Sequence, residues 1–390
     1  MNEPSRMSRH ESSNVTKKSN MLENDSVSLN KELNKRVRKE SDKMKKNEPK
    51  KRKIYKLTIF FIIADLLALV CFVIVYFVPS VKTTVINTAY GTMTHKYLAY
   101  IFYSEKTVDK VRSSNYIIPI NEDVDLNQIV IDTSEKQHYD SIEDEQILKR
   151  DPSTPGYKVI DIDHIGNSHG YLVAIYDPSR VHLITKEKLG TPGKLGERII
   201  DMCNRYNGLV CINGGGFWEE DGWGVDRPIG SVVSNGEIIW SSGYNPNANL
   251  IAMTWDNKLL LTVNSAENAV ANENVRDALE FGPFLIVNGT PMTTVGDGGY
   301  GRSPRVAIAQ RKDGIILFLV VDGSALYIDG ATLTDVIEVL QRYGAWNAAN
   351  LDGGNSSTLV INGKTHNTLM PNAARTGGRY VVNGWALLPE

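Results

Sequence analysis

Cysteine is scarce in this chain of 390 residues, which contains only Cys71, Cys203 and Cys211. No cysteine and histidine residues have the spacing of a zinc site, and this excludes a zinc centre built on such a motif. Cys203 and Cys211 fall on the apolar faces of an expected helix and of the strand that follows it. We therefore expect two buried free thiols, with a disulfide as the less favoured alternative.

The Gly-x-Ser-x-Gly motif of serine hydrolases is also missing. His164, His169 and His182 have no nucleophile motif paired with them, so we expect structural roles for these three histidines. The candidates for chemistry must therefore be sought among acids, arginines and glycine-rich loops.

Residues 1–53 contain few large apolar residues. Sixteen Lys or Arg stand there against eight Asp or Glu, a net charge of plus eight. This composition cannot bury enough apolar surface to fold, so we expect a disordered basic tail. Its positive charge favours contact with anionic membrane lipid. Aromatic residues do not alternate with the basic ones, so no nucleic-acid binding is expected.

Residues 54–78 include an apolar run of 22 residues, Leu57–Val78. Because a helix of about 20 apolar residues spans a bilayer, we expect a single-pass transmembrane helix in the cell membrane. The basic cluster Lys50–Lys53 precedes the run, which predicts a cytoplasmic N-terminus and an extracellular remainder. A cleaved signal peptide is the alternative, but the charged lead is too long for one. Asp65 within the span is either tolerated off-centre or paired with another helix.

Residues 79–150 are expected to connect the membrane to a globular domain. Apolar residues from Thr83 to Val111 have helical spacing, which predicts a stalk helix. The segment from Asn121 to Asp151 is acidic and polar, which predicts a linker. Short strands and turns begin at about Gly156, and residues 151–390 are enough for one domain with a substantial core.

Strand candidates dominate residues 151–390. They are Tyr171–Tyr176, Val181–Ile184, Leu209–Ile212, Ile229–Val233, Glu237–Trp240, Leu250–Thr254, Leu259–Val263, Phe284–Val287, Arg305–Ala309, Ile315–Val321, Ser357–Ile361 and Tyr380–Leu387. The best helix is Thr334–Tyr343, whose apolar residues have helical spacing. Hairpin turns are predicted at Asn235-Gly236, Asn288-Gly289, Asp313-Gly314 and Asn362-Gly363. The sequence therefore predicts an α+β domain with a strand-rich, largely antiparallel core.

Two segments of this domain share one layout. The helix-like Ile199–Tyr206 leads through a strand into Asn213-Gly214-Gly215-Gly216-Phe217, and Val336–Tyr343 leads in the same way into Leu351-Asp352-Gly353-Gly354. Glycines let a backbone approach a ligand and direct N–H groups at an anion, and an aspartate beside them handles a proton or an electrophilic carbon. Two such loops can converge on one ligand. The repetition is either an internal duplication or a chance likeness of two amphipathic helices.

A second aspartate, Asp322, follows the apolar strand Ile315–Val321, which should be buried on both faces. Arg302 and Arg305 stand at the start of another strand, and Arg379 precedes the last one. Guanidinium groups bind carboxylates and phosphates in bidentate fashion. Taken singly, the aspartate could instead cap a turn and each arginine could form a surface salt bridge.

Six motifs stand in the order in which they occur in the phosphodiester glycosidase family. They are Asn213-Gly214-Gly215-Gly216-Phe217, Pro228-Ile229-Gly230-Ser231, Gly282-Pro283-Phe284-Leu285-Ile286, Pro304-Arg305-Val306-Ala307-Ile308, Val321-Asp322-Gly323 and Asn350-Leu351-Asp352-Gly353-Gly354-Asn355-Ser356-Ser357. The chain resembles that family over about residues 157–389, and the tail and the apolar run lie outside the resemblance. We expect a bacterial, membrane-anchored member with a Gram-positive type of envelope.

The resemblance implies catalytic roles for Asp352 and Asp322. The substrate-binding residues that it implies are Asn213, Gly214, Gly215, Arg302, Arg305, Gly353, Gly354, Ser356 and Arg379. Asp352 is expected to act as base or nucleophile, with Asp322 orienting the sugar or sharing that role. Asn355 stands where the family usually carries a third glycine, and Ser324 where an arginine is common, and both departures concern the substrate. No cofactor is assigned, and a divalent cation near the two aspartates stays open because no ligand spacing supports one.

The implied function is hydrolysis of a sugar-1-phosphodiester, of the N-acetylglucosamine-1-phosphate type, in cell-envelope or exopolysaccharide glycans. One alternative is a protein that binds envelope polysaccharide and organises its assembly without catalysis. Another is a different transferase or hydrolase acting on peptidoglycan or teichoic-acid-like phosphodiester polymers. Analysis of the products separates the non-catalytic alternative from the other two.

Overall fold

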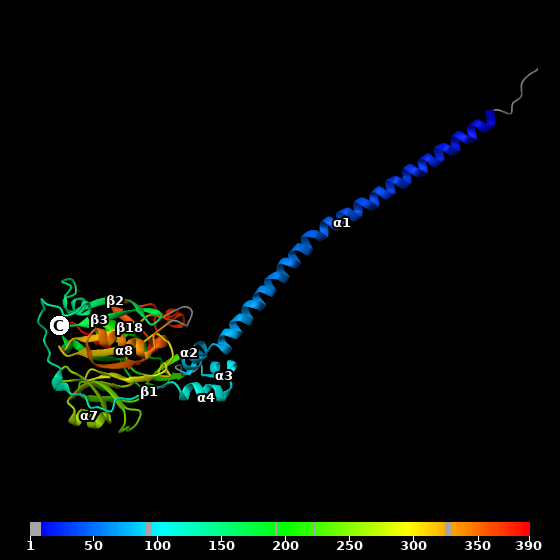
Figure 1. The fold of residues 1–390 in the computed structure, drawn as a ribbon. Helices are drawn as coiled ribbons and strands as arrows, with labels where there is room; N and C mark the ends of the chain where they lie inside the picture. Colours follow the sequence, from blue (N-terminus) through cyan, green and yellow to red (C-terminus); the bar gives the residue numbers. More distant parts are fainter. Residues whose placement is uncertain (1–8, 91–95, 192, 221–222, 324–329) are drawn as a thin grey trace, which may run out of the picture. The chain divides into compact units, whose positions relative to one another are not determined.

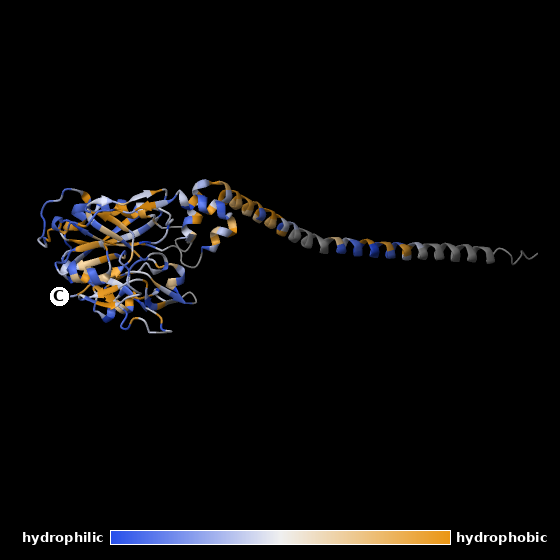
Figure 2. Ribbon diagram, turned by 90° about the horizontal axis from the view of Figure 1, so that it is seen from below, coloured by the Kyte–Doolittle hydropathy of each residue, from blue (hydrophilic) through white to orange (hydrophobic). Residues whose placement is uncertain are grey.

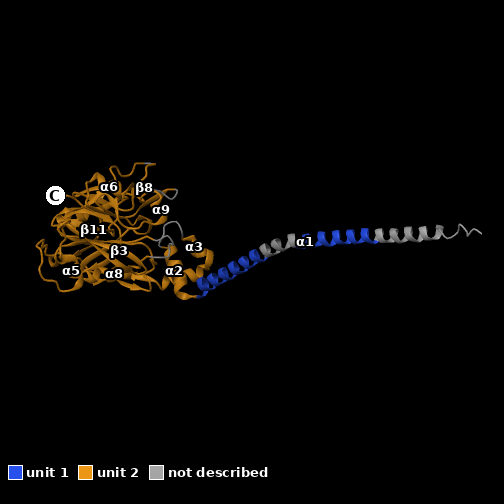
Figure 3. Cartoon of the chain, turned by 90° about the horizontal axis from the view of Figure 1, so that it is seen from above, with its two compact units in different colours: residues 1–77 blue, residues 78–390 orange. Residues whose placement is uncertain are grey.

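The computed structural model describes residues 9–90, 96–191, 193–220, 223–323 and 330–390 (Figure 1). The chain divides into two compact units, residues 1–77 and residues 78–390 (Figure 3). The first unit holds most of the apolar run, and the second holds every candidate site residue.

The described part of the first unit is one helix, α1, from Arg9 to Phe77. Its segment Tyr55–Phe77 is long and apolar enough to cross a membrane, and it coincides with the expected span (Figure 2). A disordered tail was expected over residues 1–53, and in the described part of that range α1 continues through the basic residues, while residues 1–8 lie outside the described residues. Lys, Arg, Glu and Leu are good helix formers, and pairs such as Glu32 and Arg36, with 3.9 Å between their charged atoms, favour a helix.

Three short helices begin the second unit: α2 (Pro79–Tyr90), α3 (Tyr97–Phe102) and α4 (Glu105–Ser113). They replace the single stalk helix expected from Thr83 to Val111. The backbone is extended at Ser104, which is a favourable residue type for the start of a helix and precedes α4. The chain changes direction between these helices, which lets the three pack on one another. Ile86 of α2, Ala99 of α3 and Val108 of α4 are fully buried.

The acidic segment 121–151 lies on the globular domain and is not a free linker. It contains the 3-10 turn η1 (Leu126–Gln128) and the helix α5 (Ile142–Leu148). Ile129 and Ile147 are fully buried, and Asp144 forms an ion pair of 2.9 Å with Arg311. The expectation of a linker is therefore corrected: a few apolar residues spaced among the acids attach the segment to the domain.

This packing predicts that the segment contributes to stability. In a fragment of residues 78–390, Ile147→Ala should lower the free energy of unfolding by about 2–4 kcal/mol, because it leaves a cavity at a buried site. Ile142→Ala, on the same helix but 75% exposed, is the matched control and should change it by less than about 0.5 kcal/mol. Urea denaturation measures both. Equal midpoints for the two variants would show that the segment does not pack on the domain in solution.

Three large sheets form the domain, and every pairing between the described strands is antiparallel. The central sheet has the order β15 (Thr290–Pro291), β14 (Phe284–Val287), β19 (Ala345–Leu351), β17 (Val306–Arg311), β18 (Ile316–Val321), β3 (Ser168–Ile175) and β2 (Tyr157–Ile165). The second has the order β21 (Lys364–Thr365), β20 (Leu359–Ile361), β6 (Val210–Asn213), β23 (Asn383–Leu387) and β4 (Val181–Thr185). The third has the order β10 (Glu237–Trp240), β9 (Val232–Ser234), β13 (Val275–Glu280), β11 (Asn249–Thr254) and β12 (Leu259–Val263). Three strand pairs complete the set: β1 (Tyr116–Ile118) with β16 (Thr293–Val295), β22 (Tyr380–Val381) with β5 (Glu197–Arg198), and β7 (Phe217–Glu220) with β8 (Trp223–Pro228).

The central sheet is covered on both faces (Figure 1). One face packs against α8 (Leu333–Arg342), which buries residues such as Val336 and Leu340. The other face packs against the second and third sheets, where Phe318 and Trp385 belong to one core cluster. The helices α6 (Ile199–Arg205) and α7 (Ala266–Asn272) cover the outer faces of the second and third sheets. The core therefore consists of stacked layers with the central sheet in the middle.

The predicted α+β class with an antiparallel core is confirmed. Strand β18 is buried at every position, as its apolar sequence predicts. The four predicted hairpin turns join β9 to β10, β14 to β15, β17 to β18 and β20 to β21. Asn288 and Gly289 have φ values of 50° and 77°, the left-handed conformation that a two-residue hairpin loop requires and that Asn-Gly adopts readily.

Cys203 and Cys211 form a disulfide, which corrects the expectation of free thiols. Helix α6 folds back onto β6, and the Cα atoms of the two cysteines lie 5.9 Å apart, within the range for such a bond. Gly208 makes this close approach possible, because a Cβ atom there would lie 2.5 Å from the Cys211 sulfur. The apolar faces were predicted, but the turn that brings them together was not.

Candidate active site

The two glycine loops meet in space, as the sequence predicts. They follow β6 and β19, which belong to different sheets. The Asn213 amide Nδ2 donates to the Asp352 carbonyl at 2.6 Å, and its Oδ1 accepts from the Thr358 N–H at 3.0 Å. The Asp352 N–H donates to the Gly214 carbonyl at 2.9 Å. Three hydrogen bonds therefore hold one loop against the other.

Asn213 was expected to bind substrate, and the structure gives its side chain a different task. Both ends of its amide bond the backbone of the second loop, and the residue is 1% exposed. The side-chain amide thus fixes the backbone at Asp352, and the expected contact of Asn213 with substrate stays a prediction.

The N–H groups of three expected substrate-binding glycines are used within the protein. Gly214 donates to the Asn383 carbonyl at 3.0 Å, and Gly215 donates to the Asn383 Oδ1 at 2.8 Å. Gly354 donates to the Pro304 carbonyl at 2.9 Å. These amides are not directed at a ligand, so the expected anion cradle is corrected at these positions.

Close packing explains why glycine stands in these loops. A Cβ atom at Gly214 would lie 2.4 Å from the Asn383 Oδ1, and one at Gly353 would lie 2.6 Å from the Pro304 carbonyl oxygen. No side chain fits at such distances, so glycine is needed for the loops to approach their supports.

The Asp352 carboxyl group lies at the meeting point of the loops. Burial raises its pKa to about 6, and the charge of Glu219 also raises it. A hydrogen bond from the Ser356 side chain, the positive charge of Arg379 and the Gly353 N–H each lower it, by less than burial raises it. The carboxyl group is therefore ionised for the most part at neutral pH, yet it can take up a proton near pH 6.

Arg379 and Glu219 form an ion pair beside Asp352. Glu219 lies on β7, three residues after the first glycine loop, and Arg379 precedes β22. The guanidinium group also lies over the Phe217 ring, 5.8 Å from its centroid. The two side chains are 15% and 18% exposed, so a ligand can reach them from solvent.

No pattern in the sequence singled out Glu219. The available signal was an acid placed two residues after Phe217 on a short strand that leaves a glycine loop, since alternate residues of a strand share a face. The structure thus assembles the candidate site from three segments of the chain, which carry Glu219, Asp352 with Ser356, and Arg379.

Arg305 was expected to bind substrate, but its side chain is buried within the protein. It donates to the carbonyl oxygens of Tyr300, Gly301 and Ala331 at 2.8–3.1 Å. Burial lowers its pKa to about 10, which leaves the group protonated at neutral pH. This arginine braces the segment that supports Gly353, and its expected contact with substrate stays a prediction.

Arg302 also has a structural contact. Its Nη1 lies 3.1 Å from the Asp335 carboxylate and donates to the Gly330 carbonyl at 3.3 Å. Asp335 caps the start of α8 through Thr332. Arg302 therefore joins that cap, and the structure does not bring it together with Asp352.

Asp322 lies in a separate cluster. Its carboxylate accepts from the Thr368 N–H at 2.7 Å and lies 3.2 Å from the His169 Nδ1. Val306 of β17 pairs with Val320 on one side and with Leu351 on the other. Strand β17 therefore lies between the strands that lead to Asp322 and Asp352, which places the backbones of the two aspartates about 10 Å apart. Among the described residues no hydrogen bond or ion pair joins Asp322 to Asp352.

Two further expectations concern metal and the loop after Asp322. Within the described ranges, no group of three or more His, Cys, Asp or Glu residues could hold a metal ion. Ser324 lies outside the described residues.

Comparisons with known proteins bear on this site. Residues 206–388 match the family model described as phosphodiester glycosidase. The chain is 29% identical over 194 residues to the SPbeta prophage-derived uncharacterized protein YomE of Bacillus subtilis (strain 168). This alignment covers 47% of this chain and 29% of that protein. It is 28% identical over 213 residues to the N-acetylglucosamine-1-phosphodiester alpha-N-acetylglucosaminidase of Bos taurus. That alignment covers 50% of this chain and 39% of the bovine protein.

The aligned region thus spans well under half the length of these curated relatives. Among solved structures, the catalytic domain of the zebrafish enzyme of the same name, auto-inhibited by its pro-peptide, aligns with a TM-score of 0.49 at 22% identity, covering 60% of this chain and 82% of that one. Every candidate site residue lies within the range that the family model matches. Residues 206–388, just under half of this chain, therefore match the model of the phosphodiester glycosidase family.

Proposed function

We propose that this protein is a membrane-anchored extracellular hydrolase that cleaves a sugar-1-phosphodiester, of the N-acetylglucosamine-1-phosphate type, in glycans of the cell envelope. The observation that carries the proposal is the meeting of the two glycine loops, which holds the Asp352 carboxyl group near the partly exposed pair of Arg379 and Glu219. The family match and the name of the bovine relative support the choice of bond and sugar.

The chemistry of the bond suits these residues. When the C1–O bond breaks, its electron pair leaves with the phosphomonoester, whose second pKa near 6 makes it a good leaving group. Arg379 would bind the phosphate oxygens and stabilise the charge that develops on them. Asp352, ionised above about pH 6, would meet the oxocarbenium-like C1 as nucleophile or as the base that takes a proton from water. Water supplies the new oxygen on C1.

Glu219 replaces Asp322 as the second carboxylate of the proposal. It holds Arg379 in place and contributes negative charge beside Asp352. Ser356 would orient the Asp352 carboxyl group through its hydrogen bond.

The orientation in the membrane is also a proposal. The cluster Lys50–Lys53 precedes the span Tyr55–Phe77, which favours a cytoplasmic N-terminus. The disulfide Cys203–Cys211 supports an oxidising compartment for the second unit, because such bonds persist mainly outside the cytoplasm.

The test is incubation of the full chain in detergent with N-acetylglucosamine-α-1-phosphodiesters, followed by mass spectrometry. We expect free N-acetylglucosamine and the phosphomonoester as products. If neither these compounds nor purified wall polymers are cleaved, the non-catalytic binding protein becomes the better description.

The separate position of Asp322 gives a further prediction. Asp322→Asn should lower kcat/KM by less than about tenfold, because the carboxylate contacts His169 and the Thr368 N–H and does not contact the cluster around Asp352. His169→Gln should have a similar small effect and serves as the matched variant. A loss for Asp322→Asn as large as that for Asp352→Asn would return Asp322 to the catalytic group.

A further inference from the structure

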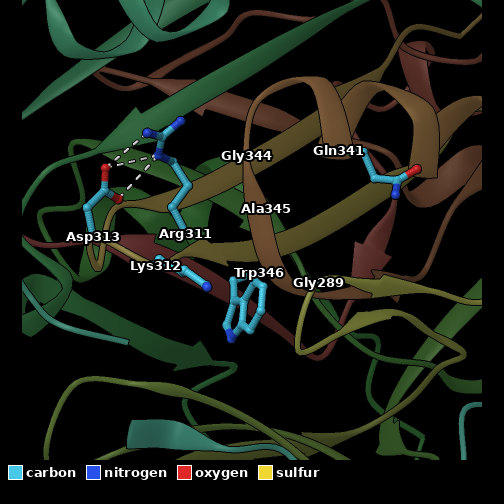
Figure 4. A pocket seen from close by; sticks show the side chains of 8 residues that line it. All are labelled: Gly289, Arg311, Lys312, Asp313, Gln341, Gly344, Ala345 and Trp346. Atoms are coloured by element: carbon cyan, nitrogen blue, oxygen red, sulfur yellow. Dashed lines mark hydrogen bonds and ion pairs between the residues drawn. The ribbon is translucent and has the colours of Figure 1, made fainter. Parts of the chain in front are cut away.

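A cavity of about 410 Å³ opens at the end of the central sheet that is remote from Asp352 (Figure 4). Trp346 and Lys312 line it, together with the Arg311–Asp313 pair and Gln341. Strand β19 runs from this cavity toward Asp352, and the six residue steps from Trp346 to Asp352 span about 20 Å. The cavity is therefore a different place from the site already described.

The indole of Trp346 is held in a fixed position at the cavity. A Cβ atom at Gly289 would lie 2.4 Å from its ring, so the hairpin backbone at Gly289 packs directly on the ring. The indole Nε1 is buried and has no hydrogen-bond acceptor among the described residues. An aromatic ring that is already fixed offers a stacking surface at little entropic cost.

The charges at the cavity differ in their pairing. Arg311 is neutralised by Asp313 at 3.0 Å and by Asp144 at 2.9 Å. Lys312 forms no ion pair within the described ranges, and its Nζ lies 3.8 Å from the centroid of the Trp346 ring. Figure 4 shows Lys312 beside the indole, with the Arg311–Asp313 pair on one side and Gln341 on the other. An anion can therefore pair with Lys312 without breaking an existing salt bridge.

We propose that this cavity is a second binding site, for an anionic saccharide unit. The Lys312 ammonium would leave the face of the indole to pair with the sugar's carboxylate or phosphate. The C–H groups on one face of the sugar ring would then stack on the indole face that Lys312 has left. Gln341 would donate to and accept from ring hydroxyls. The volume admits a small saccharide and is too small for a folded partner. Such a site would keep the protein on an envelope glycan, and its binding does not depend on the hydrolysis proposed above.

The test is saturation-transfer NMR and calorimetry on the full chain in detergent micelles. The probes are a hyaluronan tetrasaccharide, which carries glucuronate, and chitotetraose, which is neutral. We expect the hyaluronan probe to bind about fivefold more tightly than chitotetraose, and Lys312→Ala to remove that difference. Trp346→Ala should abolish binding of both probes. Control variants are Lys364→Ala and Trp255→Ala, which change exposed residues outside the cavity.

Thermal unfolding shows whether each variant is folded. If Trp346→Ala is unfolded, Gln341→Ala takes its place as the variant expected to weaken binding of both probes. Unchanged binding in the Lys312, Trp346 and Gln341 variants, or equal affinity of the wild type for the two probes, would overturn the assignment. Failure of the hydrolysis assay would leave these binding results unaffected, so the two proposals can fail separately.

Discussion

Asp352→Asn is expected to lower kcat by about 10³-fold or more while leaving the folded state at least as stable as the wild type. The loss of activity follows from removal of the group that is proposed to act on C1. The stability follows from burial, which raises the pKa of this carboxyl group to about 6 from an ordinary value near 4. Asparagine keeps the shape and removes the buried charge.

The pH dependence of this effect has a definite sign. Because the folded protein binds the Asp352 proton more tightly than the unfolded chain, the contribution to stability is fully present below about pH 4 and is lost as the pH rises through about 6. At pH 8 the ionised group costs on the order of 2–3 kcal/mol, so Asp352→Asn should stabilise the protein more at pH 8 than at pH 5.

Thermal unfolding at pH 5 and pH 8 measures the stability of Asp352→Asn, and the phosphodiester assay measures its activity. Asp161→Asn is the matched control, because the Asp161 side chain is 72% exposed and should affect neither quantity. An active Asp352→Asn protein would refute the assigned role. An inactive but strongly destabilised one would show that the carboxylate serves the fold.

Arg379→Met should lower kcat/KM by about 10²–10³-fold, because no other cation is assigned to stabilise the leaving phosphate. It should also move the acidic limb of the pH–rate profile to higher pH, since the positive charge of Arg379 lowers the pKa of Asp352. The methionine side chain preserves packing against Phe217 and removes only the charge.

Glu219→Gln should shift the acidic limb of the pH–rate profile in the opposite direction to Arg379→Met. Glu219 raises the pKa of Asp352, so its neutralisation should move the acidic limb to lower pH. Profiles of kcat/KM between about pH 4 and pH 8 compare the two variants, with Arg379→Lys as the variant that keeps the charge. Shifts in the same direction for Arg379→Met and Glu219→Gln would contradict the arrangement of charges around Asp352.

Several parts of the site were predictable because they are local in sequence. The strand Ile315–Val321, the helix that ends at about Tyr343 and the Asn-Gly turns each carry their own periodicity or turn chemistry. The order of the glycine motifs indicated the family and placed Asp352 at the centre. These inferences need no knowledge of which segments meet.

The roles of the arginines could not be read in the same way. Arg302, Arg305 and Arg379 all stand beside strands in the sequence, but only Arg379 lies beside Asp352. Whether a guanidinium group faces a ligand or a set of carbonyl oxygens depends on the neighbours that folding brings to it. The glycine N–H groups were misassigned for the same reason, since Asn383 and Pro304 come from distant segments.

By itself, then, the sequence determined the long apolar stretch, the antiparallel α+β class and the resemblance to the phosphodiester glycosidases, because each rests on composition, on short-range periodicity or on ordered motifs. Only the tertiary structure decided that Glu219 pairs with Arg379, that the Asn213 and Arg305 side chains bond backbone carbonyl groups, and that Cys203 bonds Cys211. These are contacts between segments whose meeting is set by packing of the three sheets, and no pattern along the chain encodes such a meeting directly.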